Sequence, residues 1–239
     1  MAKPRALHIQ NEVTDPCVPF MEALEPRGFD VETVHAYGDE QLPDSLSGID
    51  AVVAGGGLVD THQAGEYRWL AHEISLVAEA IETSTPYIGL CLGAQVLTEA
   101  AGGEVYRCDP HEVGWHEVEL LPAAADDPLF GGLPKRFTTM QWHYYACRPN
   151  GAAVELATNS AALQALRVGE CAWGTQFHIE ATREVLLGWL EMGGDDLRAN
   201  GYPPDVYQSL LDRHYDQHAE VGRRLAARFA ELAATRSAG

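Results

Sequence analysis

The chain has 239 residues, enough to bury a full core without disulfides, and its 46% hydrophobic and 21% charged residues exclude a disordered or fibrous protein. Its formal net charge is −19, and such an acidic surface repels phosphate backbones and anionic lipids. We therefore expect no nucleic-acid or membrane partner. No apolar stretch reaches the length of a signal segment or a bilayer span, so a cytoplasmic location is expected.

The first half of the chain alternates predicted strands with predicted helices. Apolar runs predict strands at residues 6–10, 31–36, 50–54 and 86–90. Helical periodicity and stop signals predict helices at residues 19–26, 65–82 and 92–101. This alternation is typical of a mainly parallel open sheet with helices on both faces, so the expected fold class is α/β.

The second half is richer in strands, which we expect to add an antiparallel portion to the sheet. Turn signals such as Asp109-Pro110 separate predicted strands at residues 104–106, 113–120, 136–142, 154–157, 163–168 and 171–177. A helix at 181–192 follows, and residues 205–235 are predicted to form one or two amphipathic helices. We therefore expect a main domain over residues 1–192 and a helical C-terminal extension over 193–239 that packs on it.

The strongest local motif is Gly89-Leu90-Cys91-Leu92-Gly93, between a short apolar strand and a helix. A cysteine at such a sharp turn is typical of a nucleophile elbow, because the glycines leave room for a strained backbone that lifts the thiol clear of the sheet. The helix N-terminus favours thiolate, and the N–H of Leu92 points at the substrate oxygen. The competing interpretation is a buried structural cysteine.

Gly55-Gly56-Gly57 follows the predicted strand at 50–54. A glycine loop after an earlier strand supplies the second oxyanion donor in elbow architectures. The alternatives are a merely flexible loop, or a phosphate cradle, which the absence of a following Lys-Ser/Thr disfavours.

A histidine with a carboxylate two residues further on ends the predicted strand at 171–177. A cysteine nucleophile needs a histidine within hydrogen-bond reach and a group that orients this histidine, which suits His178 and Glu180. A lone histidine is more often a surface or core residue, so the assignment depends on the pairing. His143 is the next candidate for the base.

Together these motifs resemble the class I glutamine amidotransferases, the triad-type family that includes the glutaminase domain of GMP synthetase. The resemblance covers about residues 5–190 and implies the flavodoxin-like fold of that family. The matching pieces, in family order, are Gly55-Gly56-Gly57, Gly89-Leu-Cys91-Leu-Gly93-Ala-Gln95, Glu112-Val-Gly114-Trp115, Gln141-Trp142-His143 and Gln176-Phe-His178-Ile-Glu180.

The resemblance also implies a role for each matching position. Cys91 is the expected nucleophile, His178 the base and acid, and Glu180 the carboxylate that orients it. The N–H groups of Gly56 and Leu92 are the expected oxyanion donors. The expected substrate-binding residues are Gly55, Gly57, Gln95, Tyr144 and Tyr145.

Three positions depart from the family pattern. Ile179 and Gly57 stand where the family often has proline, and Tyr144 and Tyr145 stand where small or acidic residues are common. The tyrosines bear on the substrate, since one ring could stack over a group larger than ammonia or both could simply pack in the core.

The expected function is hydrolysis of a γ-glutamyl amide through a cysteine thioester, which releases ammonia or an amine. A γ-glutamyl peptidase or conjugate hydrolase is the alternative enzyme, and a non-catalytic binding or regulatory protein the alternative from another class. A cysteine-elbow protein of the stress-chaperone and deglycase type is disfavoured by residues 176–180. No cofactor or metal is expected. Because the C-terminal extension is shorter than a normal domain, released ammonia would serve a separate synthetase subunit, or else hydrolysis is itself the function.

Overall fold

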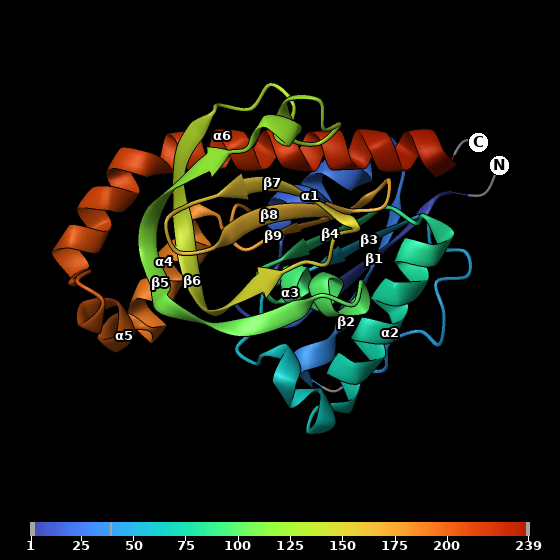
Figure 1. The fold of residues 1–239 in the computed structure, drawn as a ribbon, viewed down its shortest axis with the longest axis horizontal. Coiled ribbons are helices and arrows are strands. Elements are labelled where there is room, and N and C mark those ends of the chain that lie inside the picture. Colours follow the sequence, from blue (N-terminus) through green and yellow to red (C-terminus); the bar gives the residue numbers. More distant parts are fainter. Residues whose placement is uncertain (1–2, 39, 238–239) are drawn as a thin grey trace.

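The computed structural model describes residues 3–38 and 40–237, and within them one nine-stranded mixed sheet forms the centre of the molecule (Figure 1). The order across the sheet is β2-β1-β3-β4-β9-β8-β7-β5-β6. Pairings from β2 to β9 are parallel, and those from β9 to β6 are antiparallel. The strands are β1 (Arg5–Gln10), β2 (Asp30–His35), β3 (Ala51–Ala54), β4 (Tyr87–Leu90), β5 (Glu104–Leu120), β6 (Arg136–Arg148), β7 (Ala153–Thr158), β8 (Leu163–Val168) and β9 (Ala172–Thr175).

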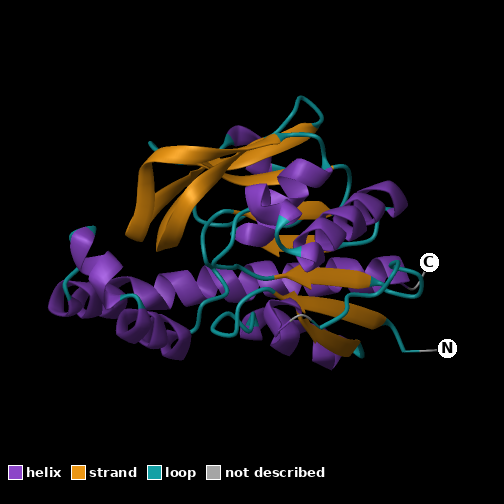
Figure 2. Ribbon diagram, turned by 90° about the horizontal axis from the view of Figure 1, so that it is seen from below, coloured by secondary structure: helices purple, strands orange, loops and turns teal. Residues whose placement is uncertain are grey.

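Helices cover both faces of the parallel part, so the expected α/β fold with an added antiparallel portion is confirmed (Figure 2). None of the helices that the structure describes is both long and apolar enough to cross a bilayer. They are α1 (Val18–Leu24), α2 (Arg68–Thr83), α3 (Leu92–Ala100), α4 (Arg183–Met192), α5 (Gly194–Ala199) and α6 (Pro204–Ser237), with short 3-10 segments at η1 (Glu25–Arg27), η2 (Ala36–Gly38), η3 (Thr61–Gly65) and η4 (Pro122–Ala125).

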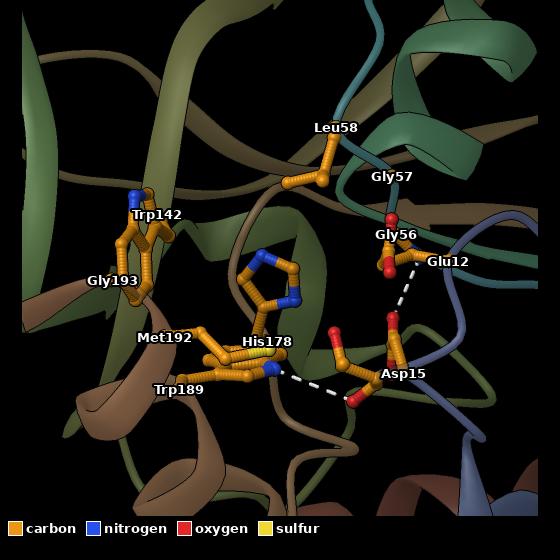
Figure 3. A pocket seen from close by; sticks show the side chains of 11 residues that line it. Glu12, Asp15, Gly56, Gly57, Leu58, Trp142, His178, Trp189, Met192 and Gly193 are labelled. Atoms are coloured by element: carbon orange, nitrogen blue, oxygen red, sulfur yellow. Dashed lines mark hydrogen bonds between the residues drawn. The ribbon is translucent and has the colours of Figure 1, made fainter.

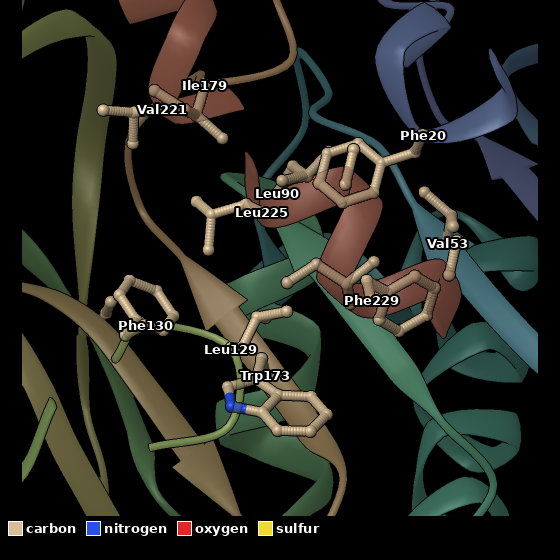
Figure 4. Packing of buried hydrophobic residues seen from close by; sticks show 14 of the residues in the cluster. Phe20, Val53, Leu90, Leu129, Phe130, Trp173, Ile179, Val221, Leu225 and Phe229 are labelled. Carbon is tan, nitrogen blue, oxygen red and sulfur yellow. The ribbon is translucent and has the colours of Figure 1, made fainter. Parts of the chain in front are cut away.

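Successive side chains of β3 point to opposite faces of the sheet, and each face has its own hydrophobic cluster. Val53 points into a cluster with Phe20 of α1 and Phe229 of α6, whose rings meet edge to face at 6.2 Å (Figure 4). Val52, one residue away, points into the opposite cluster with Leu70 of α2. Each such fully buried side chain contributes about 1.5–3 kcal/mol, which fixes α1 and α6 on one face and α2 and α3 on the other.

The structure corrects two expectations about the second half. Residues 104–106 and 113–120 were expected to be separate strands, but both belong to β5, and Asp109-Pro110 lies where the pairing register with β6 shifts. Proline is tolerated at such an irregularity because no ladder hydrogen bond is required of it. The strand expected to end at residue 142 continues to Arg148, so Tyr144 and Tyr145 lie within β6.

The C-terminal part of the chain forms one long helix, α6, which packs against the segment that follows β9, including Ile179 and Ala181. Gly222 comes so close that a Cβ atom there would lie 2.3 Å from the carbonyl oxygen of Ile179. His218, on the face of α6 toward this segment, is buried. Its ring nitrogens bond the hydroxyl of Thr139 at 3.0 Å and the carbonyl of Ala181 at 2.9 Å. Burial lowers the pKa of His218 to about 4, so the ring is neutral and uses one nitrogen as donor and one as acceptor.

Candidate active site

Cys91 forms the turn between β4 and α3, and its backbone is in the strained conformation that an elbow requires, with φ 50° and ψ −99°. The glycines on either side are sterically required. A Cβ at Gly89 would lie 2.3 Å from the carbonyl of Gly93, and one at Gly93 would lie 2.6 Å from the carbonyl oxygen of Ala54. The local sequence therefore dictates the turn that presents the thiol.

His178 and Glu180 lie in the segment after β9, next to the end of β4 in the sheet. His178 Nδ1 and Glu180 Oε1 are 2.7 Å apart, and both side chains are buried. Burial alone disfavours the imidazolium, but the charges of Cys91 and Glu180 outweigh it and raise the pKa of His178 well above its usual value. A charged imidazole next to a cysteine is an arrangement that cysteine nucleophiles use.

The thiol of Cys91 has two further polar neighbours. Gln176 Nε2 donates toward Sγ at 3.6 Å, and Sγ lies 3.9 Å from the carbonyl oxygen of Trp142. Gln176 belongs to the motif that includes His178, but sequence reasoning gave it no role of its own.

Asp15, in the loop between β1 and α1, was missed by sequence reasoning. Its carboxylate oxygen Oδ2 accepts a 2.7 Å hydrogen bond from the backbone N–H of Gly56 (Figure 3). Asp15 is buried, and burial together with the neighbouring Glu180 raises its pKa to about 7. The N–H that was expected to stabilise an oxyanion is thus occupied by a side chain, whereas Leu92 begins α3, where the first backbone N–H groups have no partner within the helix.

Asp15, His178 and Glu180 form the only group of three metal-type ligands in residues 3–38 and 40–237, with one ligand atom from each within 4.8 Å of the others. Such a group could hold a cation. The short bond between His178 and Glu180 already uses one atom of each, which is the arrangement needed to orient an imidazole. Glu180 Oε2 is buried without a hydrogen-bond partner.

Cys91 opens into a cavity of about 340 Å³ that is also lined by Gln95, Tyr144 and Tyr145. Three of the expected substrate-binding residues therefore lie around the thiol. Gly57 lines this cavity too, but Gly55 does not, because its N–H bonds Ile9 and its carbonyl accepts from Asn11 at 3.2 Å.

The two tyrosines are held differently. The Tyr144 hydroxyl donates to Asp196 at 2.6 Å, and burial and this bond raise the pKa of Tyr144 to about 12. Tyr145 packs its ring against His62 at 5.2 Å, and its carbonyl bonds Gln95. Arg107, also in the cavity wall, is a cation that sequence reasoning missed, and no local motif marks it.

A second cavity, of about 270 Å³, lies on the side of His178 (Figure 3). Its walls include Trp142 and Trp189, whose rings meet at 84°, and Trp189 also packs against His178 with ring centroids 4.8 Å apart. Met192 and Gly193 also line this cavity. The expected boundary between the main domain and the C-terminal extension therefore falls between two residues of the same cavity.

His143, the second candidate for the base, is occupied by bonds within the protein. Its Nδ1 bonds the carbonyl of Tyr145 at 2.9 Å, and its Nε2 bonds Glu112 at 3.2 Å. Glu112 in turn accepts from Gln164 at 2.7 Å. These bonds join β5, β6 and β8, which is a structural role for His143.

A family model described as glutamine amidotransferase class-I matches residues 20–186, which include the elbow, His178 and Glu180. The chain belongs to the class I glutamine amidotransferases. A glutamine amidotransferase from Thermotoga maritima has a similar structure, with a TM-score of 0.85 and 24% identity over 97% of this chain and 100% of the other. A second, from Methylobacillus flagellatus, has a TM-score of 0.82 and 22% identity over 97% and 95%. At these identities the likeness concerns the fold.

The chain is also similar to two curated relatives of different lengths. The putative glutamine amidotransferase-like protein YfeJ of Salmonella typhimurium is 26% identical over 74% of this chain and 76% of its own length. The GMP synthase [glutamine-hydrolyzing] of Aeropyrum pernix is 33% identical over 82% of this chain, which spans 36% of that relative.

Proposed function

We propose that this class I glutamine amidotransferase hydrolyses a γ-glutamyl amide, with Cys91 as nucleophile, His178 as base and acid, and Glu180 as the group that orients His178. The observation that carries the proposal is the buried pair of His178 and Glu180, 2.7 Å apart, beside a cysteine in a strained elbow. Cys17 also has a positive φ, but with ψ 36° it lies in the ordinary left-handed region, whereas Cys91 combines φ 50° with ψ −99°. A structural cysteine has no need of that strained conformation or of an imidazolium neighbour.

In this reaction the Cys91 thiolate attacks the amide carbon, and the carbon–nitrogen bond breaks as His178 gives its proton to the leaving nitrogen. Water then hydrolyses the thioester, with His178 as base, and releases glutamate. The N–H of Leu92 is the first donor for the oxyanion. Gly56 becomes the second donor when its N–H turns from Asp15 toward the substrate.

The glutamyl end is a zwitterion, so its pocket must offer both kinds of charge partner. Gln95 can donate and accept through its amide, and Arg107 can meet the carboxylate. When glutamine is the substrate, the ammonia would serve a separate synthetase subunit. Two of the matched relatives, from Methanococcus maripaludis and Pyrococcus abyssi, are each named as one subunit of a GMP synthase [glutamine-hydrolyzing], which supports such a pairing.

The test is release of glutamate from glutamine and from γ-glutamyl amides by the purified chain, with Cys91→Ala as control. We expect turnover by the native chain and none by the variant. Equal glutamate release by both would refute the proposal.

A further inference from the structure

Two cavities meet at the residues of the proposed reaction. Cys91 lines one and His178 lines the other, while Gly57, Leu58 and Trp142 line both. In Figure 3 the side chains of Leu58 and Trp142 stand on either side of the His178 ring. A substrate whose carbonyl carbon reaches Cys91 and whose nitrogen reaches His178 therefore has its two halves in different cavities.

The cavity beside His178 is larger than the release of ammonia requires. Ammonia is about as large as a water molecule, which occupies about 30 Å³ in the liquid. The cavity, in contrast, measures about 270 Å³. This volume suits an amine with a ring or a short alkyl chain. The cavity beside Cys91, which holds Gln95 and Arg107, suits the glutamyl half.

The residues that line the cavity beside His178 indicate which kind of amine it can bind. Trp142, Trp189 and Met192 offer apolar and aromatic surface. Its charged residues besides His178 are the acidic Glu12 and Asp15, and no lysine or arginine lines it. A carboxylate on the amine would lose water here and face Glu12 and Asp15, and the one cation in the lining, His178, is already paired with Glu180.

We propose that the cavity beside His178 binds the amine half of the substrate, and that this amine is apolar or aromatic and carries no carboxylate. This proposal rests on the hydrolysis proposed above and names its substrate class. The bond that breaks is the γ-glutamyl carbon–nitrogen bond, the proton of His178 goes to the departing amine, and water completes glutamate.

The experiment compares two conjugates that differ by one carboxylate, γ-glutamyl-phenethylamide and γ-glutamyl-phenylalanine, with glutamine as reference. We expect kcat/KM for the phenethylamide to be at least about tenfold above that of each of the others, because only this amine gains apolar contact without repulsion. Equal values, or glutamine as the best substrate, would overturn the proposal. The latter outcome would indicate that an ammonia acceptor covers the exposed side chains of Leu58 and Met192 instead.

A second experiment places a positive charge at the edge of the cavity beside His178. Met192 ends α4 and is 64% exposed, so Met192→Lys should fold and should put a cation at the cavity. We expect it to raise kcat/KM for the phenylalanine conjugate relative to the phenethylamide by about three- to tenfold. Leu187→Lys adds the same charge to α4 away from either cavity and should leave the ratio unchanged. Identical ratios in both variants would contradict the assignment.

A diazoketone analogue of glutamine, which has no amine half, reports on Cys91 separately. Labelling of Cys91 without a preference for the phenethylamide would overturn the cavity assignment and leave the proposed hydrolysis standing. No labelling and no turnover of any conjugate would overturn both.

Discussion

Asp15 Oδ2 accepts a 2.7 Å hydrogen bond from the backbone N–H of Gly56. A carboxyl oxygen of the same residue lies within 4.8 Å of a ring nitrogen of His178 and of a carboxyl oxygen of Glu180. One loop residue thus touches the glycine loop and adjoins the proposed base. This position gives Asp15 two effects that can be separated: it fixes where the Gly56 N–H points, and it adds negative charge beside His178.

Asp15→Asn keeps an oxygen for the Gly56 N–H but removes the charge. Because the imidazolium of His178 then loses a neighbouring anion, the alkaline limb of the pH profile of kcat/KM should move to lower pH by on the order of one unit. The measurement is the pH dependence of γ-glutamyl amide hydrolysis by both proteins. Superimposable profiles would show that Asp15 carries no charge that His178 senses.

Cys91 should be the first cysteine to react with an alkylating agent at neutral pH. Burial raises the pKa of Cys17 well above its usual value and that of Cys147 to about 12, and it also raises the pKa of Cys108 and Cys171. Those four thiols therefore stay protonated and unreactive. Peptide mass mapping after brief alkylation gives the answer, and early modification of any of the four would contradict the assignment of the nucleophile.

His178→Ala should lower turnover about as much as Cys91→Ala, since nucleophile and base act as a unit. Glu180→Gln should lower kcat by about tens-fold to thousands-fold, because the amide orients the ring but does not stabilise its charge. His143 offers no substitute base, as both of its ring nitrogens are engaged. Near-normal kcat for His178→Ala would require a different base.

Gly193→Ala should distort the cavity beside His178. A Cβ there would lie 2.0 Å from Cη2 of Trp142, so the ring must shift, and we expect a loss of about 1–3 kcal/mol of stability with a changed preference among amines. Gly188 is the matched control in α4, since a Cβ there meets nothing within 4 Å. Gly188→Ala should be neutral or stabilising by about 0.5–1 kcal/mol. Denaturant unfolding of both variants measures the difference.

Glu73, buried in α2, should make stability depend on pH. Burial raises its pKa from 4.5 to about 8, so the folded chain keeps a proton that the unfolded chain releases in this range. The stability that Glu73 contributes is present below pH 4.5 and is lost as pH rises through 8. Glu73→Gln should remove this loss, on the order of 3 kcal/mol between pH 5 and pH 9. Parallel stability curves for both proteins would contradict the prediction.

Local steric demands explain which features the sequence could predict. The elbow is determined by five adjacent residues, in which Gly89 and Gly93 leave room that no other residue leaves, so β4, Cys91 and α3 could be located from the sequence. Apolar runs likewise predicted strands β1 to β4, and their alternation with helices predicted the parallel pairing. Turn signals were less reliable, because Asp109-Pro110 interrupts the pairing of β5 without ending the strand.

Features that depend on distant segments could not be predicted. Asp15 meets Gly56 across 41 residues of sequence, and no pattern around Asp15 marks it. Trp142 is positioned by Gly193 and by Asp196, whose Oδ2 accepts from its indole N–H at 2.8 Å. The extension after residue 192 was expected to pack on the main domain, but the sequence did not indicate that residues on both sides of that position contact the same tryptophan, Trp142.

The close packing of α6 against the segment after β9 links the end of the chain to the proposed base. Gly222 abuts Ile179, and His218 bonds the carbonyl of Ala181. Elements joined in this way open as one cooperative unit, so backbone amides of residues 178–181 and of the middle of α6 should exchange with solvent deuterium at matching opening free energies. Cys91 lies in the turn between β4 and α3 instead. A chain whose last helix comes loose would therefore lose its base while the nucleophile is still in place.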